Sequence, residues 1–597
     1  IFKYNQGPGY SYSDMNAYGS SINRYFVYKT YWLCLGIVFF ILTILFYNRG
    51  LTSNFKERFK IAKNRFNGWH PFFLSVFTIL FIAIGSYIYY TNNVENIRRS
   101  SKEQEIATVE WEKKYKKYEK YAQPRIISVN VNLDLFPKTR DFNVDGEYML
   151  VNKSGQIIDS IFLDHSSRIS TFEFDRENTL VLEDTTYHFD IYEFKNPILP
   201  GDSLKLNFTV RNKPNTLLRN NSPVLYNGTF LSNQNFPSLG YQGYELTDDK
   251  TREKYDLPPN ELKPLPSDST ALGNTYISKD SDWIDFEATV STSVDQIAIA
   301  PGYLQKEWVD GDRRYFNYKM DSKILNFYSF NSADYQVFKD SWNDVSLEIY
   351  YHSGHDYNLD RMMKGMKAAL EYCSENFSPY QHKQLRIIEF PKSQGFYAQA
   401  FPNTVPFSEG LGFIADVDDS EEGGNDYPFY VTAHEVAHQW FAHQVIGADV
   451  LGATVMSESL SEYVGLKIIE SVNGKNKMRK FLKKSLDDYL LSRTFETKRE
   501  NALMFNDGQG YIHYQKGSLV FYALSDYLGE KNLNKAISKY VKKVAFQDPP
   551  YTTSIELLDY VKEATPDSLN YILKDMFETI TLYDNNAVSA VSKKMDN

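Results

Sequence analysis

The sequence has few cysteines and no long basic tract, and each absence excludes a class of protein. Its 597 residues include two cysteines, Cys34 and Cys373. Two cysteines exclude a disulfide framework and a cysteine-rich zinc module, so any metal must be bound by histidines and carboxylates. The formal net charge of −10 gives no support for nucleic-acid binding. The chain is also too long for one hydrophobic core, which predicts several folded units.

Charge is absent from two apolar runs near the N-terminus, residues 30–48 and 71–90. At about 1.5 Å per residue, each run is long enough as a helix to cross a hydrocarbon layer of roughly 30 Å. We therefore predict a transmembrane hairpin that ends a membrane region over residues 1–92. The alternative is a pair of buried core helices. Because the chain begins with Ile1 rather than Met, we interpret it as part of a longer or processed polypeptide.

The loop between the two runs, residues 49–70, predicts the orientation of the hairpin. It holds six Lys or Arg residues and one Glu, whereas the flanks of the hairpin carry fewer basic residues for their length. Because basic loops stay in the cytoplasm, this loop is expected there. Everything after Asn92 is then expected on the other side of the membrane.

Beyond the hairpin, the sequence predicts an α+β chain in four further parts. Residues 93–122 are charged and helix-favouring, as in a stalk helix. Residues 123–350 contain short alternating runs separated by Gly, Asn, Asp or Pro, which predict a β-rich domain. Residues 351–475 mix helical spacing with strands and are predicted to form the catalytic domain. Residues 476–597 favour helices.

Residues 432–438, Thr-Ala-His-Glu-Val-Ala-His, carry the most specific chemical signal. Positions i and i+4 of a helix share one face, so His434 and His438 can direct both imidazoles at one point. Glu435 projects from a neighbouring face, where such motifs place a carboxylate against a metal-bound water. The five-residue pattern also arises by chance on solvated helices, so the prediction of a zinc site depends on the surrounding residues.

A catalytic zinc site of this kind needs a third protein ligand and one position for water. The helix-like segment 456–470 carries Glu458 near its start and Glu462 one turn later. We predict that Glu458 is the third ligand. Glu462 is either a partner of a ligating histidine or a surface carboxylate.

Two further residues are candidates for contact with a substrate. Tyr514 precedes Lys516 and Gly517 at the head of an apolar helix. There its phenol can donate a hydrogen bond to a developing oxyanion, or it is simply a core aromatic. Glu409 lies within a strand-like apolar run, where it either binds the ammonium group of a peptide's N-terminus or protects a sheet edge from aggregation.

Over residues 124–580 these motifs resemble the aminopeptidase N family of gluzincin zinc metallopeptidases. The family's zinc motif continues as His-Gln-Trp-Phe, and here residues 439–441 are Gln, Trp and Phe. Its third ligand lies in Asn-Glu-Gly-Phe-Ala-x-Tyr, which corresponds to residues 457–463. Its oxyanion tyrosine precedes a Lys-Gly pair, as Tyr514 does. Its glutamate for the substrate's amino terminus lies in Gly-x-Met-Glu-Asn-Trp-Gly, which we align with residues 406–412.

The resemblance implies a thermolysin-like α/β catalytic domain and hydrolysis of peptides, with removal of N-terminal residues. It implies one Zn²⁺ ion, and it assigns the site residues as follows: metal ligands His434, His438 and Glu458, general base Glu435, oxyanion donor Tyr514, and substrate-amine binder Glu409. The family also takes a substrate-amine contact from its β domain, and the corresponding stretch here is residues 227–242.

The sequence departs from the family pattern at two places. Nineteen residues separate His438 from Glu458, where the family has eighteen, and we expect the loop 445–453 to accommodate the extra residue. The Met-Glu-Asn core around the amine-binding glutamate is reduced to Ser408, Glu409 and Gly410. Of that three-residue core, the carboxylate alone is kept.

The hairpin resembles the end of the membrane region in bacterial proteins that fuse a transporter-permease-like region to such a peptidase. This resemblance implies an inner-membrane protein with a periplasmic peptidase, and further membrane-domain or transporter subunits as partners. Two other functions stay open. The protein is an endopeptidase or a peptidase of narrow specificity, or it is a non-catalytic extracytoplasmic module of a membrane complex. The peptidase could also regulate the attached membrane region, on which the sequence is silent.

Overall fold

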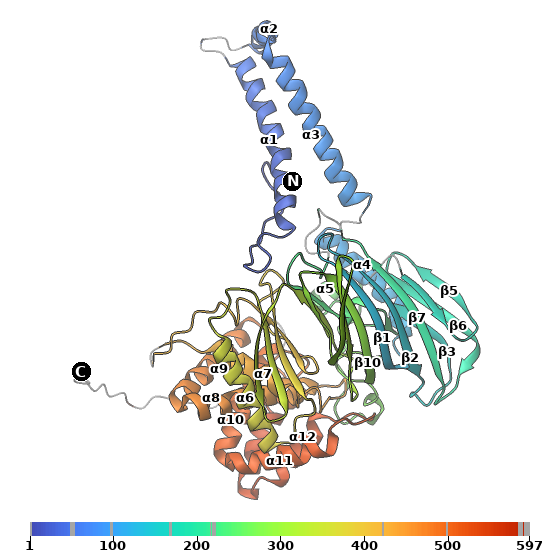
Figure 1. Ribbon diagram of the computed structural model, residues 1–597, viewed down its shortest axis with the longest axis vertical. Coiled ribbons are helices and arrows are strands. Elements are labelled where there is room, and N and C mark those ends of the chain that lie inside the picture. The colour runs from blue at the N-terminus through green and yellow to red at the C-terminus, as the bar shows by residue number, and fades with distance from the viewer. Residues whose placement is uncertain are drawn as a thin grey trace.

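The computed structural model shows a mixed α/β protein with two apolar N-terminal helices, a β-rich region and a C-terminal region dominated by helices (Figure 1). It describes residues 3–582 apart from 48–49, 51–53, 96–98, 166–169, 215–216, 218–221, 421–422 and 497–498, and it also describes residue 589. Parts of the predicted loop 49–70, of the predicted stalk and of the C-terminal region 476–597 therefore lie outside the described residues.

The apolar runs form α1 (Ser21–Phe46) and α3 (Trp69–Asn93), joined through the short helix α2 (Phe55–Arg65). In Figure 1 α1 and α3 stand side by side, away from the rest of the chain. Tyr31 stacks on Phe81 with a centroid distance of 4.4 Å. Both helices are long and apolar enough to cross a membrane, and their side chains are mostly exposed, unlike those of a core helix. Length and composition thus give weak support for membrane anchoring.

The predicted stalk contains α4 (Ser101–Tyr115), which packs against the β-rich region. A capping box of Ser100 and Glu103 begins the helix. Trp111 stacks on Tyr241 at 4.5 Å. The fully buried Arg252 guanidinium donates to Glu112 at 2.7 Å. The helix is therefore fixed to the β-rich region rather than free in solvent.

Among the described residues the β-rich region contains three sheets, and buried positions alternate along stretches such as residues 129–136. The largest has the order β12-β13-β10-β1-β2-β7-β4, with β14 beside β10; a second has the order β5-β6-β3-β9 and a third β11-β15-β8. The strands are β1 (Arg125–Phe136), β2 (Asp141–Val151), β3 (Ile158–Asp164), β4 (Ser170–Phe174), β5 (Asn178–Asp184), β6 (Phe189–Ile198), β7 (Ser203–Asn212), β8 (Thr229–Ser232), β9 (Ser238–Leu239), β10 (Trp283–Ser293), β11 (Ile297–Ile299), β12 (Tyr303–Asp310), β13 (Arg313–Lys319), β14 (Ile324–Leu325) and β15 (Ser329–Ala333).

A fourth sheet has the order β16-β17-β18-β19 and supports the candidate site. Its strands are β16 (Gln336–Trp342), β17 (Val345–Tyr351), β18 (Gln384–Phe390) and β19 (Thr404–Ser408). The last three run parallel. The crossover helix α6 (Leu359–Asn376) packs against α7 (Tyr427–Ala437), and its methionines and leucines join the core beneath the sheet.

The remaining helices extend the same hydrophobic core toward the C-terminus. Buried residues from Val345 to Phe577 form one cluster, so the core is continuous across residue 475. The helices are α8 (Leu460–Asn473), α9 (Lys475–Phe495), α10 (Gly517–Leu528), α11 (Glu530–Val544), α12 (Ser554–Glu563) and α13 (Asn570–Leu573). Two π-helical turns, η4 (Val455–Ser459) and η6 (Ile512–Lys516), precede α8 and α10.

Candidate metal centre and its surroundings

Helix α7 presents the two histidines of the motif. Asp426 caps its N-terminus by accepting from the Phe429 N–H at 3.1 Å, and Pro428 occupies the first turn. The α-helix ends at Ala437, earlier than the apolar pattern suggests, and His438 forms its C-cap. His434 and His438 are both buried, with their Nε2 atoms 3.0 Å apart.

Glu458 approaches the two imidazoles from the π-helical turn η4. Its Oε2 lies 3.6 Å from His434 Nε2 and 3.4 Å from His438 Nε2. The structure therefore brings together the three residues that the sequence predicts as metal ligands. A π-helical turn contains one residue more than an α-helical turn and is often found at functional sites. Placement of the extra residue in the loop 445–453 stays a prediction, and the π-helical turn at Glu458 is a second place that can hold it.

Polar contacts on the far side of each imidazole fix its orientation. Nδ1 of His438 lies 3.0 Å from the carbonyl oxygen of Phe441 and 3.1 Å from the Ser461 hydroxyl. Nδ1 of His434 lies 3.1 Å from Glu462 Oε1. A proton on each Nδ1 leaves the Nε2 lone pairs directed at Glu458, as metal ligation requires. Glu462 is therefore a partner of His434 rather than a surface carboxylate.

The donor set fits a zinc ion. Two imidazole nitrogens and one carboxylate oxygen converge within 4.8 Å of one another, and His₂Glu is a known ligand set for catalytic zinc. Oε2 of Glu458 and Oε2 of Glu435 are buried without hydrogen-bond partners among the described residues. Buried polar atoms without partners are costly, and a bound cation and its water would satisfy them.

Glu435 is buried beside this donor set. Burial raises the pKa of its carboxyl, while the neighbouring His438 and His434 act in the opposite direction. The backbone N–H of Ala400 also faces the Glu435 carboxylate, and the Ala400 carbonyl lies 3.2 Å from His443 Nε2. The segment 397–401 therefore runs along the metal centre, a placement that no sequence signal predicts.

Tyr514 lies on the opposite π-helical turn, η6, with its ring centroid 6.2 Å from that of His434. The residue is 36% exposed, so part of its side chain is accessible to solvent. Burial, together with the charges of Glu458 and Glu435, raises its pKa. The hydroxyl consequently stays protonated at neutral pH and can act as a hydrogen-bond donor.

Comparison with known families matches this part of the chain, residues 361–578. The match is to the Peptidase family M1 domain. Aminopeptidase M1 of Arabidopsis thaliana is 24% identical over 276 residues, which is 44% of this chain and 31% of that protein. Tricorn protease-interacting factor F2 of Thermoplasma volcanium is 25% identical over 190 residues, 30% of this chain and 24% of that protein. The chain thus spans less than a third of the length of these relatives.

The fold agrees with the M1 match. The crystal structure of an M1 zinc metallopeptidase from Deinococcus radiodurans covers 78% of this chain and 96% of its own, with a TM-score of 0.53 at 14% identity. At this identity the likeness shows the fold alone. The M1 domain match supports a zinc-dependent, aminopeptidase-like hydrolase.

Beside the M1 motifs lies a hydrogen-bond network around His513 that sequence reasoning missed. Oδ1 of Asn506 accepts from the Gln509 N–H at 3.0 Å, which directs its Nδ2 to His513 Nδ1 at 2.9 Å. Nδ1 is therefore an acceptor, so the neutral ring carries its proton on Nε2. The Thr454 hydroxyl lies 3.0 Å from the same Nδ1. The only local signal was that His513 directly precedes Tyr514.

A second contact joins the two π-helical turns. The Ser459 hydroxyl donates to the His513 carbonyl at 2.7 Å. A Cβ on Gly517 would lie 2.2 Å from that hydroxyl oxygen, so only glycine allows this approach. The Gly of the Lys-Gly pair therefore lets the turn that carries Tyr514 pack against the turn that carries Glu458.

The β-rich region also reaches the metal centre, through Tyr276. Burial and the charge of Glu458 raise the pKa of the Tyr276 phenol. This residue lies outside the stretch 227–242 in which a substrate contact is expected. Within that stretch, Asn227 contacts Met15 and Asp334 instead.

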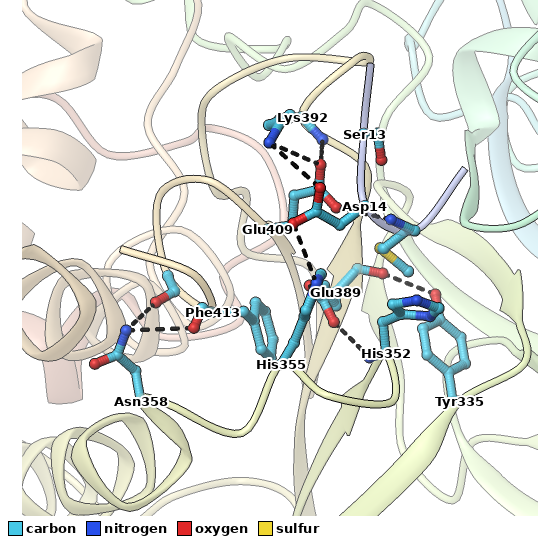
Figure 2. Close-up of polar contacts among 12 residues, drawn as sticks. Ser13, Asp14, Tyr335, His352, His355, Asn358, Glu389, Lys392, Glu409 and Phe413 are labelled. Carbon is cyan, nitrogen blue, oxygen red and sulfur yellow. Dashed lines mark hydrogen bonds and ion pairs between the residues drawn. The ribbon is translucent and has the colours of Figure 1, made fainter. Parts of the chain in front are cut away.

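The structure does not bring Glu409 to the metal centre. Its side chain is fully buried, with 0% exposure. It lies in a separate group of donors with His355 and Glu389 (Figure 2). Among the described residues its carboxylate accepts from the backbone N–H groups of Met15 and Lys392, each at 3.2 Å. Its placement gives no support to the predicted contact with a substrate's ammonium group.

Proposed function

We propose that this protein is a membrane-anchored, zinc-dependent peptidase that cleaves peptides at the centre formed by His434, His438 and Glu458. The observation that carries the proposal is the convergence of these three donors within 4.8 Å of one another, beside Glu435 on the same helix and the Tyr514 ring, whose centroid lies 6.2 Å from that of His434. The M1 domain match supports the same reaction class.

The residues of the chain account for each proton in peptide hydrolysis. Zinc held by His434, His438 and Glu458 would supply a Lewis acid for the scissile carbonyl and for the attacking water. Glu435 accepts the water's proton and passes it to the leaving amine, a role favoured by its burial-raised pKa. Tyr514 donates its phenolic hydrogen to the oxygen that gains negative charge. Glu462, Ser461 and the Phe441 carbonyl keep the imidazoles oriented.

We propose removal of N-terminal residues as the primary activity, because the relatives with matching sequences include proteins named as aminopeptidases. The burial of Glu409 favours endopeptidase activity as the second candidate, since no predicted carboxylate then binds the substrate's ammonium group. Comparing hydrolysis of free and N-acetylated peptides separates the two. A large preference for free peptides supports an aminopeptidase, and equal rates support an endopeptidase.

Glu435→Gln and zinc analysis of the purified full chain test the reaction itself. The proposal expects one zinc ion per chain and hydrolysis that falls by about 10²–10⁴ in the variant. A chain without zinc, or equal hydrolysis by the variant, contradicts the proposal and leaves the non-catalytic module as the better description.

The proposal places α1 and α3 across a bacterial inner membrane, with the loop 49–70 in the cytoplasm and the peptidase in the periplasm. The basic composition of that loop supports this orientation, and the length of both helices supports the span itself. Association with transporter-like membrane subunits is part of the same proposal. Labelling single cysteines introduced into the loop and into the β-rich region with a membrane-impermeant reagent tests it. Labelling of the loop from the periplasmic side would reverse the orientation.

A further inference from the structure

The segment before α1 folds into a turn that packs between the β-rich region and the sheet β16-β17-β18-β19. Residues 13–17 form this docking turn, in which the Ser13 N–H donates to the Ala17 carbonyl at 3.0 Å. Met15 at its tip is 4% exposed, and Ser13 is also buried. Helix α1 begins at Ser21, so only three residues separate the docking turn from the apolar hairpin.

The backbone of the docking turn is held by polar side chains from both regions. The Met15 N–H donates to Glu409 Oε2 at 3.2 Å. On the other side of the turn, Asn227 Nδ2 donates to the Met15 carbonyl at 3.0 Å, and the Asn227 N–H donates to Asn16 Oδ1 at 3.1 Å. A buried carboxylate that accepts a backbone N–H and an amide that pairs with the same residue are the elements of a peptide-binding site.

The Met15 side chain fills an apolar pocket between the two regions. Its neighbours in the hydrophobic cluster come from β11, β15, the link between β15 and β16, and β18, namely Ile299, Ala333, Tyr335 and Ile388. Gly228, with φ +90, lies beside it, where a Cβ would come within 3.3 Å of the Met15 methyl group. The backbone and the side chain of Met15 therefore both contribute to docking.

Ionisable side chains also surround the docking turn, as Figure 2 shows. Asp14 Oδ2 lies 3.7 Å from His355 Nε2, and Asp14 Oδ1 lies 4.0 Å from Lys392 Nζ. Lys392 Nζ lies 3.9 Å from Glu409 Oε1. Glu389 accepts from His355 Nδ1 at 2.5 Å. Lys392 thus lies between the carboxylate of Asp14 in the docking turn and that of Glu409 at the end of β19.

A second metal site is the alternative reading of this group, because His355, Glu389 and Glu409 place donor atoms within 4.8 Å of one another. The hydrogen bonds argue against it. Glu409 accepts the backbone N–H groups of Met15 and Lys392, and Glu389 accepts the His352 N–H and His355 Nδ1. Both carboxylates therefore already have donors, whereas Glu435 and Glu458 at the metal centre each keep a buried oxygen without a hydrogen-bond partner among the described residues.

The site that holds the docking turn is connected to the metal centre through β19. Glu409 directly follows this strand, and its N–H donates to the Phe390 carbonyl at 2.9 Å. The segment 397–401 is hydrogen-bonded to the same strand, with Ser408 N–H to the Tyr397 carbonyl at 3.0 Å and Gln399 N–H to the Pro406 carbonyl at 3.0 Å. In that segment Ala400 faces Glu435. The docking turn and the general base therefore contact the two sides of one small structural unit.

We propose that Asn227, Lys392 and Glu409 form a peptide-binding site for the chain's own docking turn. Docking of the turn then fixes the position of the segment 397–401 beside Glu435. The bound element is a tight turn. It offers the backbone N–H of Met15, the neighbouring carboxylate of Asp14 and the apolar Met15 side chain at its tip. The effect on activity rests on the proposed peptidase function, whereas the docking itself does not.

Hydrogen exchange of the full chain in detergent or nanodiscs tests the docking without any measurement of activity. Peptides that cover residues 10–20 and 392–401 are followed in the wild type, in Met15→Asp and in the milder Met15→Ala and Asn227→Ala. Gly9→Ala is the matched control, because a Cβ at Gly9 meets nothing within 4 Å. Thermal unfolding of each variant identifies any that fails to fold.

The proposal expects slow exchange at residues 10–20 in the wild type and in Gly9→Ala. It expects exchange at least about tenfold faster in Met15→Asp, at residues 10–20 and also at 392–401, with smaller increases in the two alanine variants. Fast exchange at residues 10–20 in the wild type overturns docking. Faster exchange at 10–20 with unchanged exchange at 392–401 overturns the connection to the metal centre.

Two further measurements separate this proposal from the proposed function and from the hypothesis of a second metal site. If the wild type hydrolyses peptides, kcat should fall several-fold in Met15→Asp at unchanged zinc content, and equal kcat contradicts the connection. If the wild type hydrolyses none, the peptidase proposal fails while the exchange data still decide the docking. If the chain binds two zinc ions and His355→Ala loses one of them, the proposed peptide-binding site is wrong.

Discussion

Oε1 of Glu462 lies 3.1 Å from Nδ1 of His434, on the side of the imidazole opposite the Nε2 atom that faces Glu458. The other oxygen of the same carboxylate accepts from the Tyr430 hydroxyl at 2.5 Å. Glu462 is therefore itself held in place while it orients a metal ligand. Such partners raise the basicity of a ligating histidine and fix its tautomer.

Glu462→Ala is expected to weaken zinc binding by about 10–100-fold, because His434 loses the carboxylate that orients it. Glu462→Gln should weaken it less, since a carboxamide oxygen can still accept from Nδ1. Competition with a chromophoric chelator measures both, and Glu371→Ala, at an exposed position of α6, serves as the control. Equal affinity for zinc in Glu462→Ala would show that the contact has no role in ligation.

Tyr514→Phe should lower kcat by about 10²–10³ with a much smaller change in KM, because the lost hydroxyl acts on the oxyanion rather than on the bound substrate. Zinc content should stay at the wild-type value. Tyr527→Phe, at an exposed tyrosine, is the matched control. A loss confined to KM would instead place Tyr514 in substrate binding.

His513 is predicted to position Tyr514, since its ring lies 4.5 Å from the Tyr514 ring and is held by Asn506 and Thr454. His513→Ala should lower kcat by about tenfold or more through misplacement of the phenol, with zinc affinity unchanged. Asn506→Leu should give a similar loss, because it removes the donor that fixes the imidazole. The role is refuted if His513→Ala is fully active, or if Asn506→Leu alone is inactive.

Stability should depend on pH through His382, because burial lowers its pKa to about 4 from an ordinary value of 6.5. Below pH 6.5 the unfolded chain takes up a proton that the folded chain does not. Stability is therefore complete above pH 6.5 and falls as the pH drops toward 4, by about 1 kcal/mol for each pH unit. His382→Gln should flatten this part of the curve, as measured by thermal unfolding between pH 4 and 7. Equal slopes for the two proteins would contradict the assignment.

The metal centre could be predicted from sequence because its signals are local. The spacing of His434 and His438 follows from the helical period, and Glu458 is close to them along the chain. These residues meet in the structure as the spacing suggests. The two apolar helices were predictable for the same reason, although α1 extends further toward the N-terminus than its uncharged run.

Contacts between distant parts of the chain could not be predicted in this way. Glu409 was a candidate for substrate binding because it interrupts an apolar run, but its partner Met15 is 394 residues away. The segment 397–401 carries no charge or motif, and its position beside Glu435 follows only from the sheet. The π-helical turn at Glu458 is likewise invisible to a periodicity of 3.6 residues.

The apolar hairpin is attached to the folded body at both of its ends. The docking turn precedes α1, and after α3 the chain enters α4, which the buried Arg252–Glu112 pair fastens to the β-rich region. A domain joined to a membrane helix by one linker can change its orientation relative to the membrane. Two separate attachments restrict this rotation. If the hairpin spans a bilayer, the metal centre keeps a fixed height and orientation relative to the lipid surface. Peptides that are themselves tethered to the membrane would then be cleaved at a set distance from their anchor.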